Sequence, residues 1–203
     1  MKITSIKQQV KRADRYSIFV EGKYAFSLSE SALLESKLAS GQELNDQQVK
    51  EYKKLSEDDK LYNQTLRYVA MRPRSQWEIQ FYLEKKKKAS PPLIETILNK
   101  LSNIDLINDE QLARALVHDR QLLRPTSRRK IIAELRKKHI ADEIIQRVMQ
   151  DQSPGDRAAL LAVMERKRRQ SKYQDDTKLM QYLARQGFGY DDIKQAFDQE
   201  KQQ

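Results

Sequence analysis

The sequence contains no cysteine. Without thiols there is no disulfide framework, no thiolate metal site and no cysteine nucleophile. A chain of 203 residues that folds without disulfides is typical of a reducing compartment. We therefore expect a cytoplasmic protein.

Histidine and glycine are also scarce, with two and five residues respectively. His118 and His139 have no neighbours at a metal-ligand spacing, and we expect both to be surface or partly buried side chains. The glycines form no phosphate-binding loop, because Gly187-Phe188-Gly189 lies in a turn between helices and lacks the strand that a nucleotide site needs. Paired carboxylates open helices, where capping explains them. The sequence therefore predicts no catalytic residue, no metal, no cofactor and no enzyme activity of its own.

Long apolar stretches are absent as well. No run approaches the ~20 residues that span a bilayer, and the amino terminus lacks the apolar core of a signal peptide. We therefore expect no membrane partner. Charged residues make up 33% of the chain and the mean hydropathy is −0.85, which predicts thin, divided cores. Small helical modules in series fit this composition better than one large globule.

What the sequence does contain is an internal repeat of about fifty residues. Arg72-Pro73-Arg74-Ser75 returns 52 positions later as Arg124-Pro125-Thr126-Ser127. In each copy the proline stops one helix and the serine caps the next. Apolar residues follow each serine at four-residue steps and share one helical stripe: Ile79, Leu83, Ile131 and Leu135. A fainter third copy has Asp175, Leu179 and Leu183 at the same steps, so we expect three repeats.

The residues before the repeats have a different pattern. β-branched and aromatic residues alternate at residues 2–10, 15–20 and 23–28, which predicts a three-stranded antiparallel sheet. Two helices follow, one from Ser29 and one capped by Asn45, and we expect a break or join at residues 56–59.

The predicted fold class is therefore mainly α, with tandem three-helix repeats in an elongated curved array behind a small N-terminal antiparallel β-sheet and short helices. The expected extension and three repeats are residues 1–59, 60–108, 109–153 and 154–203. Ser153-Pro154-Gly155 is the clearest linker. In the first repeat, we expect the helix from Ser75 to bury Trp77 or Phe81.

The net charge of +10 is unevenly distributed. Residues 1–59 hold ten basic and ten acidic residues, so the whole excess lies in residues 60–203. A basic surface attracts polyanions, and nucleic acid is the commonest polyanion in a cell. The candidate residues for binding a partner or DNA are Arg72, Arg74, Lys85, Lys86, Lys87, Lys88, Arg128, Arg129, Lys130, Arg166, Lys167, Arg168 and Arg169. The alternative is that these side chains are only the solvated faces of soluble helices.

Two of these candidates are at an unusual place in their helix. Arg128 and Arg129 fall in the first turn, where a cation opposes the helix dipole. Folding alone does not favour them there. They are therefore better candidates for partner contacts than residues 136–138, which suit a helix end.

Four short patterns follow one another in the order found in one bacterial family. They are Arg15-Tyr16-Ser17-Ile18-Phe19, Lys23-Tyr24-Ala25-Phe26-Ser27, Arg72-Pro73-Arg74-Ser75-x-x-Glu78-Ile79-x-x-x-Leu83 and Leu106-Ile107-Asn108-Asp109-Glu110-x-x-Ala113. Through them almost all of residues 1–197 resembles RecX, the regulator of the RecA recombinase. The chain departs from the family at Lys138-His139-Ile140, where a turn commonly has glycine, and in the third repeat, which lacks the arginine–serine opening.

The resemblance implies a non-enzymatic regulator that lies in the helical groove of a RecA filament on single-stranded DNA. There it would slow ATP hydrolysis and strand exchange and favour filament disassembly, and so act in DNA repair, recombination and the SOS response. Its partners would be RecA and single-stranded DNA, the latter contacted directly or through the filament. We expect a monomer. Two alternatives stay open: a stand-alone basic DNA-binding protein that does not need RecA, and a helical scaffold whose charge serves solubility.

Overall fold

The computed structural model describes residues 1–152 and 155–200. Ser153 and Pro154 of the expected linker lie outside these described residues. The chain divides into two compact units. The first holds residues 1–72 and 82–101, and the second holds residues 73–81 and those from 102 onward. Each unit therefore combines segments that are separated in the sequence.

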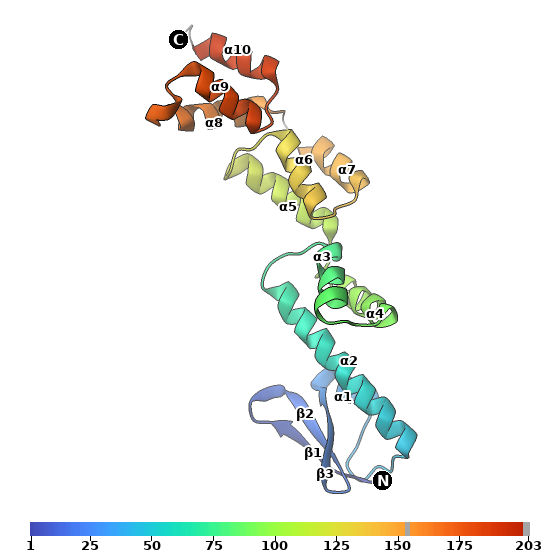
Figure 1. Cartoon of the computed structure of the whole chain (residues 1–203). Helices are drawn as coiled ribbons and strands as arrows, with labels where there is room; N and C mark the ends of the chain where they lie inside the picture. The colour runs from blue at the N-terminus through green and yellow to red at the C-terminus, as the bar shows by residue number, and fades with distance from the viewer. Residues whose placement is uncertain (153–154, 201–203) are drawn as a thin grey trace. The chain divides into compact units, whose positions relative to one another are not determined.

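The first unit joins a β-sheet to three α-helices and a π-helical turn (Figure 1). Its elements are β1 (Ile3–Gln9), β2 (Arg12–Val20), β3 (Lys23–Ser29), α1 (Glu30–Ser36), α2 (Asp46–Ala70), η1 (Tyr82–Lys86) and α4 (Pro91–Ser102). The strands pair antiparallel in the order β1-β2-β3, which confirms the predicted sheet. Gly22, at φ 74°, forms the β2–β3 turn, where a positive φ suits glycine.

The core of this unit lies between the sheet and the helices that follow it. Figure 1 shows α2 beside the sheet, and its contacts are made chiefly with β3. The buried apolar residues are Ile3, Ile18, Val20, Phe26, Leu28, Ala32, Leu38, Leu44 and Val49. A sheet of three strands is only marginally stable alone, so these contacts are what hold the N-terminal strands.

The expected break at residues 56–59 is wrong, because α2 runs through this segment. Ser56 and Asp59 are buried polar residues whose side chains bind β3. The Ser56 hydroxyl donates to the Ser27 carbonyl at 2.6 Å, and Asp59 accepts from the Ser29 backbone N–H at 2.9 Å. The polar residues that suggest a helix end from the sequence are therefore the ones that fix the helix to the sheet.

The second unit contains helices joined by turns and short loops, and no strand among its described residues. Its elements are α3 (Gln76–Phe81), α5 (Asp109–Leu122), α6 (Arg128–Lys137), α7 (Asp142–Gln152), α8 (Arg157–Arg168), η2 (Ser171–Tyr173), α9 (Asp176–Arg185) and α10 (Tyr190–Glu200). Together with the sheet, they confirm the mainly α class with three-helix repeats. The boundaries proposed above stay a prediction, although α2 crosses position 59 without interruption.

The three residues predicted to cap helices, Ser75, Ser127 and Asp175, all accept a capping hydrogen bond. Ser75 and Glu78 form a reciprocal pair of side chain to backbone hydrogen bonds, 3.2 and 3.1 Å long. Ser127 accepts from the Lys130 N–H at 3.3 Å, and Asp175 accepts from the Lys178 N–H at 3.0 Å. Each cap satisfies backbone donors that have no partner inside the helix.

The second and third repeats each have their own core. The buried residues of α5–α7 and the turn before α7 are Ala113, Val117, Ile131, Leu135, Ile140, Ile145, Val148 and Met149. Those of α8–α10 are Leu160, Val163, Met164, Leu179, Leu183, Phe188, Ile193, Ala196 and Phe197. The apolar pairs predicted from the repeat are all fully or almost fully buried.

Two carboxylates link one repeat to the next within this unit. Asp109, the first residue of α5, accepts from the Gln76 N–H at the start of α3, at 2.8 Å. Asp156, the N-cap of α8, accepts from the Arg128 N–H at the start of α6, at 2.5 Å. In both cases the first backbone N–H of a repeat's second helix donates to a carboxylate near the start of the following repeat.

The expected burial of Trp77 or Phe81 is wrong. Their side chains are 39% and 42% exposed, whereas Ile79 on the same helix is fully buried. The Trp77 ring stacks on Phe81 and on His139, with ring centroids 5.1 and 3.7 Å apart. Four-residue spacing places residues on one face but does not decide which face is buried.

Within the described ranges, no helix has both the length and the apolar composition of a membrane-spanning segment.

Candidate partner-binding surfaces

The thirteen predicted basic residues occupy four places in the fold. Arg72 and Arg74 follow α2; Lys85 to Lys88 lie in and after η1; residues 128–130 open α6; and residues 166–169 end α8. Each group sits at a different helix end. Within the second unit, Lys130 binds the Gln186 side chain, and Arg166 lines a small pocket with the same glutamine. Their roles depend on which side chains are used by the fold itself.

Arg168 is used by the fold. Its guanidinium donates to Asp176 at 2.6 Å and to Glu200 at 2.7 Å, and it also binds the backbone carbonyls of Tyr173 and Gln174. The hydrogen bonds to the two carboxylates raise the pKa of Arg168 above the ordinary value of an arginine, and the bond to Glu200 is the largest cause. The side chain therefore joins α8, α9 and α10 rather than facing a partner.

Three more candidates are partly or wholly engaged. Arg74 is buried, with 9% of its surface exposed. The Arg128 guanidinium donates to the Met149 carbonyl at 3.0 Å, which places it against the last turn of α7. The Lys167 ammonium lies over the rings of Tyr173 and Tyr182, at 5.3 and 4.8 Å from their centroids. A cation in the first turn of a helix is unfavourable to the helix dipole, but the bond to Met149 gives Arg128 a structural reason to be there.

The remaining candidates point to solvent. Lys86, Lys88, Arg129 and Arg166 are exposed and have no charged or hydrogen-bonding side-chain partner in the part of the chain that the structure describes. The others are exposed and each makes one contact: Lys85 pairs with Glu84, Lys87 lies over Tyr82, Arg169 pairs with Glu165, and Lys130 binds Gln186 at the end of α9. Arg72 is exposed as well. Lys86, Lys88, Arg129 and Arg166 are available to a polyanion because no contact among the described residues engages their side chains.

Sequence reasoning missed a group of exposed apolar residues. Met71 is 80% exposed, and Leu122 and Leu123 are 65% and 75% exposed. They end α2 and α5, just before the two Arg–Pro pairs of the repeat. Positions 71 and 123 are equivalent in the repeat, one residue before each Arg–Pro pair, and both are apolar. This equivalence is the sequence signal that could have found Met71 and Leu123.

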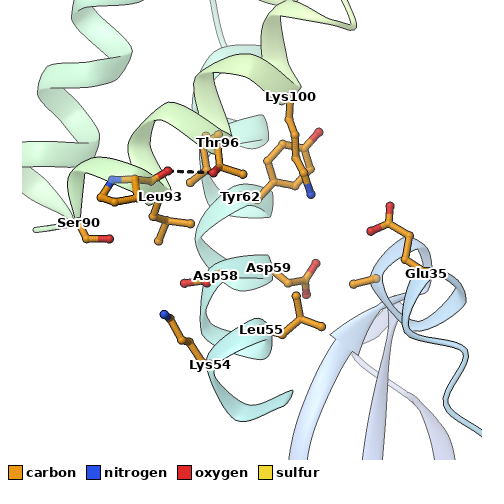
Figure 2. A pocket seen from close by; sticks show the side chains of 13 residues that line it. Glu35, Lys54, Leu55, Asp58, Asp59, Tyr62, Ser90, Leu93, Thr96 and Lys100 are labelled. Carbon is orange, nitrogen blue, oxygen red and sulfur yellow. Dashed lines mark hydrogen bonds between the residues drawn. The ribbon is translucent and has the colours of Figure 1, made fainter. Parts of the chain in front are cut away.

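A pocket of about 290 Å³ lies in the first unit between α1, α2 and α4 (Figure 2). Leu55 and Leu93 contribute apolar surface, and the Lys100 ammonium lies over the Tyr62 ring at 5.4 Å from its centroid. Burial raises the pKa of Tyr62 and of Asp58. The polar groups in its wall include no nucleophile paired with a base. Across the described residues no cluster of three or more His, Asp or Glu side chains is placed to bind a metal ion.

Three family models match separate parts of the chain. The model of the regulatory protein RecX N-terminal domain matches residues 1–45, that of the second three-helix domain of RecX matches residues 108–149, and that of the third matches residues 156–197. The first covers the sheet and α1, and the others coincide with the cores of α5–α7 and α8–α10. These matches and the fold define a class of protein in which small three-helix domains follow an N-terminal β-sheet.

Whole-chain comparisons make the assignment specific. The regulatory protein RecX of Bacillus subtilis is 30% identical over 202 residues, which is 97% of this chain and 76% of the relative. That of Listeria monocytogenes is 34% identical over 195 residues, which is 93% of this chain and 71% of the relative. The chain belongs to the RecX family.

Solved structures agree with this assignment. A crystal structure of regulatory protein RecX is 28% identical, has a TM-score of 0.76, and matches over 97% of this chain and 98% of its own. The crystal structure of RecX from Lactobacillus salivarius is 25% identical with a TM-score of 0.59, over 70% of this chain and 95% of that one.

Proposed function

We propose that this chain is a non-enzymatic regulator of the RecA recombinase. It binds RecA filaments assembled on single-stranded DNA, in the filament groove, and lowers ATP hydrolysis, strand exchange and filament growth. This role places it in recombination, DNA repair and the SOS response of the cytoplasm. The observation that carries the proposal is the match to regulatory proteins named RecX over nearly the whole chain.

The distribution of charge supports a polymeric, acidic partner. Lys86, Lys88, Arg129 and Arg166 are exposed side chains from three different helix ends, and no side chain among the residues that the structure describes pairs with them. A filament of protein and single-stranded DNA offers both acidic side chains and phosphates. Cations of this kind steer association and set its orientation.

The modular construction supports several separate contacts. The second and third repeats have separate buried cores, so each presents its own surface. A protein made of such modules is suited to a partner that repeats itself along a polymer, because each module meets an equivalent partner surface.

The test is the DNA-dependent ATPase of RecA, measured with increasing amounts of the purified chain. We expect suppression at well below one chain per RecA monomer, because a chain bound along the groove affects several subunits. No effect at equal concentrations would overturn the proposal. Binding to single-stranded DNA without RecA, measured in parallel, identifies the alternative of a stand-alone DNA-binding protein.

Charge reversal separates filament binding from solubility. The variant Arg129→Glu/Lys130→Glu changes two exposed cations and leaves the Arg128 contact with Met149 in place. We expect this variant to inhibit the RecA ATPase less than the unmodified chain does. The control is Lys11→Glu, which makes the same charge change at one exposed site in the β1–β2 turn and should inhibit normally. A double variant that inhibits like the unmodified chain would show that Arg129 and Lys130 make no contact with the filament and that their charge serves only solubility.

A further inference from the structure

The first two repeats end their first helix in the same way. Met71 is the C-cap of α2 and Leu123 is the C-cap of α5. Each has right-handed helical backbone, and each is followed by arginine and proline, as Arg72-Pro73 and Arg124-Pro125. The two positions are 52 residues apart, which is the spacing of the repeat.

Both side chains point away from the protein core. Met71 is 80% exposed and Leu123 is 75% exposed, and Leu122 beside it is 65% exposed. A single exposed apolar residue needs no explanation, because much of any protein surface is apolar. An exposed apolar residue next to an exposed arginine, at equivalent positions of two repeats, is a different observation. Neither helix end needs an apolar side chain, since its last carbonyls are satisfied by hydrogen-bond donors and are favoured by cations.

The chemistry of the pair indicates the partner. The arginines favour carboxylates, which guanidinium binds through two parallel hydrogen bonds. The neighbouring methionine and leucine have no aromatic ring to stack on a base, so they suit an apolar protein surface better than nucleic acid. Two equivalent copies fit a partner that presents the same surface more than once.

We propose that the Met71–Arg72 turn and the Leu123–Arg124 turn are two equivalent docking points for an acidic protein surface with an apolar patch beside its carboxylate. The partner carries one such surface on each of its identical subunits. This inference rests on the proposed function, where those subunits are RecA protomers of one filament. It adds which residues of this chain make the repeated contact.

The test compares binding to RecA filaments preassembled on single-stranded DNA. Met71→Gln and Leu123→Gln each remove the apolar contact and keep the arginine. We expect each to weaken binding about fivefold, as for a moderate interface residue, and the double variant about 25-fold, because losses at two sites that contact different partner subunits add in free energy. Val10→Gln, at a fully exposed residue of the β1–β2 turn, is the matched control and is expected to bind normally.

The charge contribution has its own comparison. Arg124→Glu is expected to weaken filament binding more than Arg124→Gln, because the reversed charge repels an acidic partner. Thermal unfolding of each variant should match that of the unmodified chain, since the altered side chains are exposed.

Three outcomes count against the inference, and they are distinguishable. A double glutamine variant that binds filaments like the unmodified chain overturns the docking points alone. Equal losses of binding to single-stranded DNA without RecA would mean that the two turns bind nucleic acid, which also overturns them. An unmodified chain that fails to bind filaments overturns the proposed function first and the inference with it.

Discussion

At the scale of single residues, the Asp59 side chain joins α2 to two strands of the first unit. It pairs with Arg15 at 2.9 Å, and it accepts from the Ser29 hydroxyl at 2.5 Å and from the Asn63 amide at 2.9 Å. Arg15 and Asp59 are both buried, so neither charge is screened by water. Removing one partner of such a pair leaves the other charge uncompensated.

We predict that Asp59→Ala lowers the free energy of unfolding of the first unit by about 3–5 kcal/mol. Urea unfolding followed by circular dichroism measures this. The control is Asp14→Ala, which removes the exposed 3.8 Å pair between Asp14 and Arg67 and should change stability by less than about 1 kcal/mol. Similar losses in the two variants would contradict the structural role of Asp59.

A second residue gives a prediction about pH. Burial raises the pKa of Asp109, the Gln76 N–H lowers it, and the nearby Glu78 raises it, with a net increase above 3.8. A raised folded-state pKa means that the folded protein binds this proton more tightly than the unfolded chain does. Stability from this group is therefore lost as pH rises through the interval between 3.8 and the raised pKa.

Asp109→Asn removes this titration and keeps a side-chain oxygen that can accept from Gln76. We predict that the variant gains stability relative to the unmodified chain as pH rises through that interval. Chemical unfolding at a series of acidic pH values measures the difference, in which the titrations of groups that do not interact with Asp109 cancel. A difference that does not vary with pH would show that Asp109 has no raised pKa in the folded chain.

At the scale of elements, the turn between α9 and α10 is fitted to the start of α6. The Ser127 hydroxyl donates to the Gln186 carbonyl at 2.5 Å. Gly187 follows with φ 91°, and a Cβ added there would lie 2.8 Å from the Ser127 hydroxyl oxygen. The serine that caps α6 therefore also holds the third repeat.

We predict that Gly187→Ala destabilises the chain more than Gly41→Ala. Both glycines have φ 91°, so alanine meets similar backbone strain of about 1 kcal/mol at either site. Only at Gly187 does it also clash with Ser127, whereas at Gly41 the nearest atom lies 3.9 Å away. Thermal unfolding of both variants measures the difference, and equal shifts would argue against the contact with Ser127.

The elements also show what the sequence could predict. The caps at Ser75, Ser127 and Asp175 followed from local spacing, because a cap and its apolar stripe lie within one helix. The continuity of α2 did not, because Ser56 and Asp59 are satisfied by strand residues about 30 positions away. Local periodicity carries no information about such distant partners.

The candidate surface was predictable only in part, for a similar reason. The basic clusters are visible in the sequence, but Arg168 and Arg128 are used by contacts with other helices. Whether a cation is exposed or engaged depends on residues that the fold brings beside it. The apolar residues Met71 and Leu123 carry no sequence signal except their equivalent places in the repeat.

At the scale of the whole molecule, the net positive charge lies beyond residue 59, and among the described residues only some of the basic side chains there are exposed without a partner. If this charge contacts DNA directly, the binding constant must fall with salt as counterions are released. For single strands the logarithmic slope is about −0.7 for each neutralised phosphate. The slope of the binding constant against salt concentration therefore reports how many phosphates the protein neutralises, whereas a single affinity does not.

We predict that Lys86→Gln/Lys88→Gln reduces the steepness of this slope by about 0.7 for each lysine that touches a phosphate. Both side chains are exposed after α3, and the structure gives them no partner within the residues it describes. The control is Lys50→Gln/Lys53→Gln, which removes the same charge from exposed positions of α2, beside the acidic Glu51. Fluorescence anisotropy of labelled single-stranded DNA at several salt concentrations gives both slopes. Equal slopes for the two variants would mean that the chain attracts DNA only through its net charge, and that Lys86 and Lys88 make no phosphate contact.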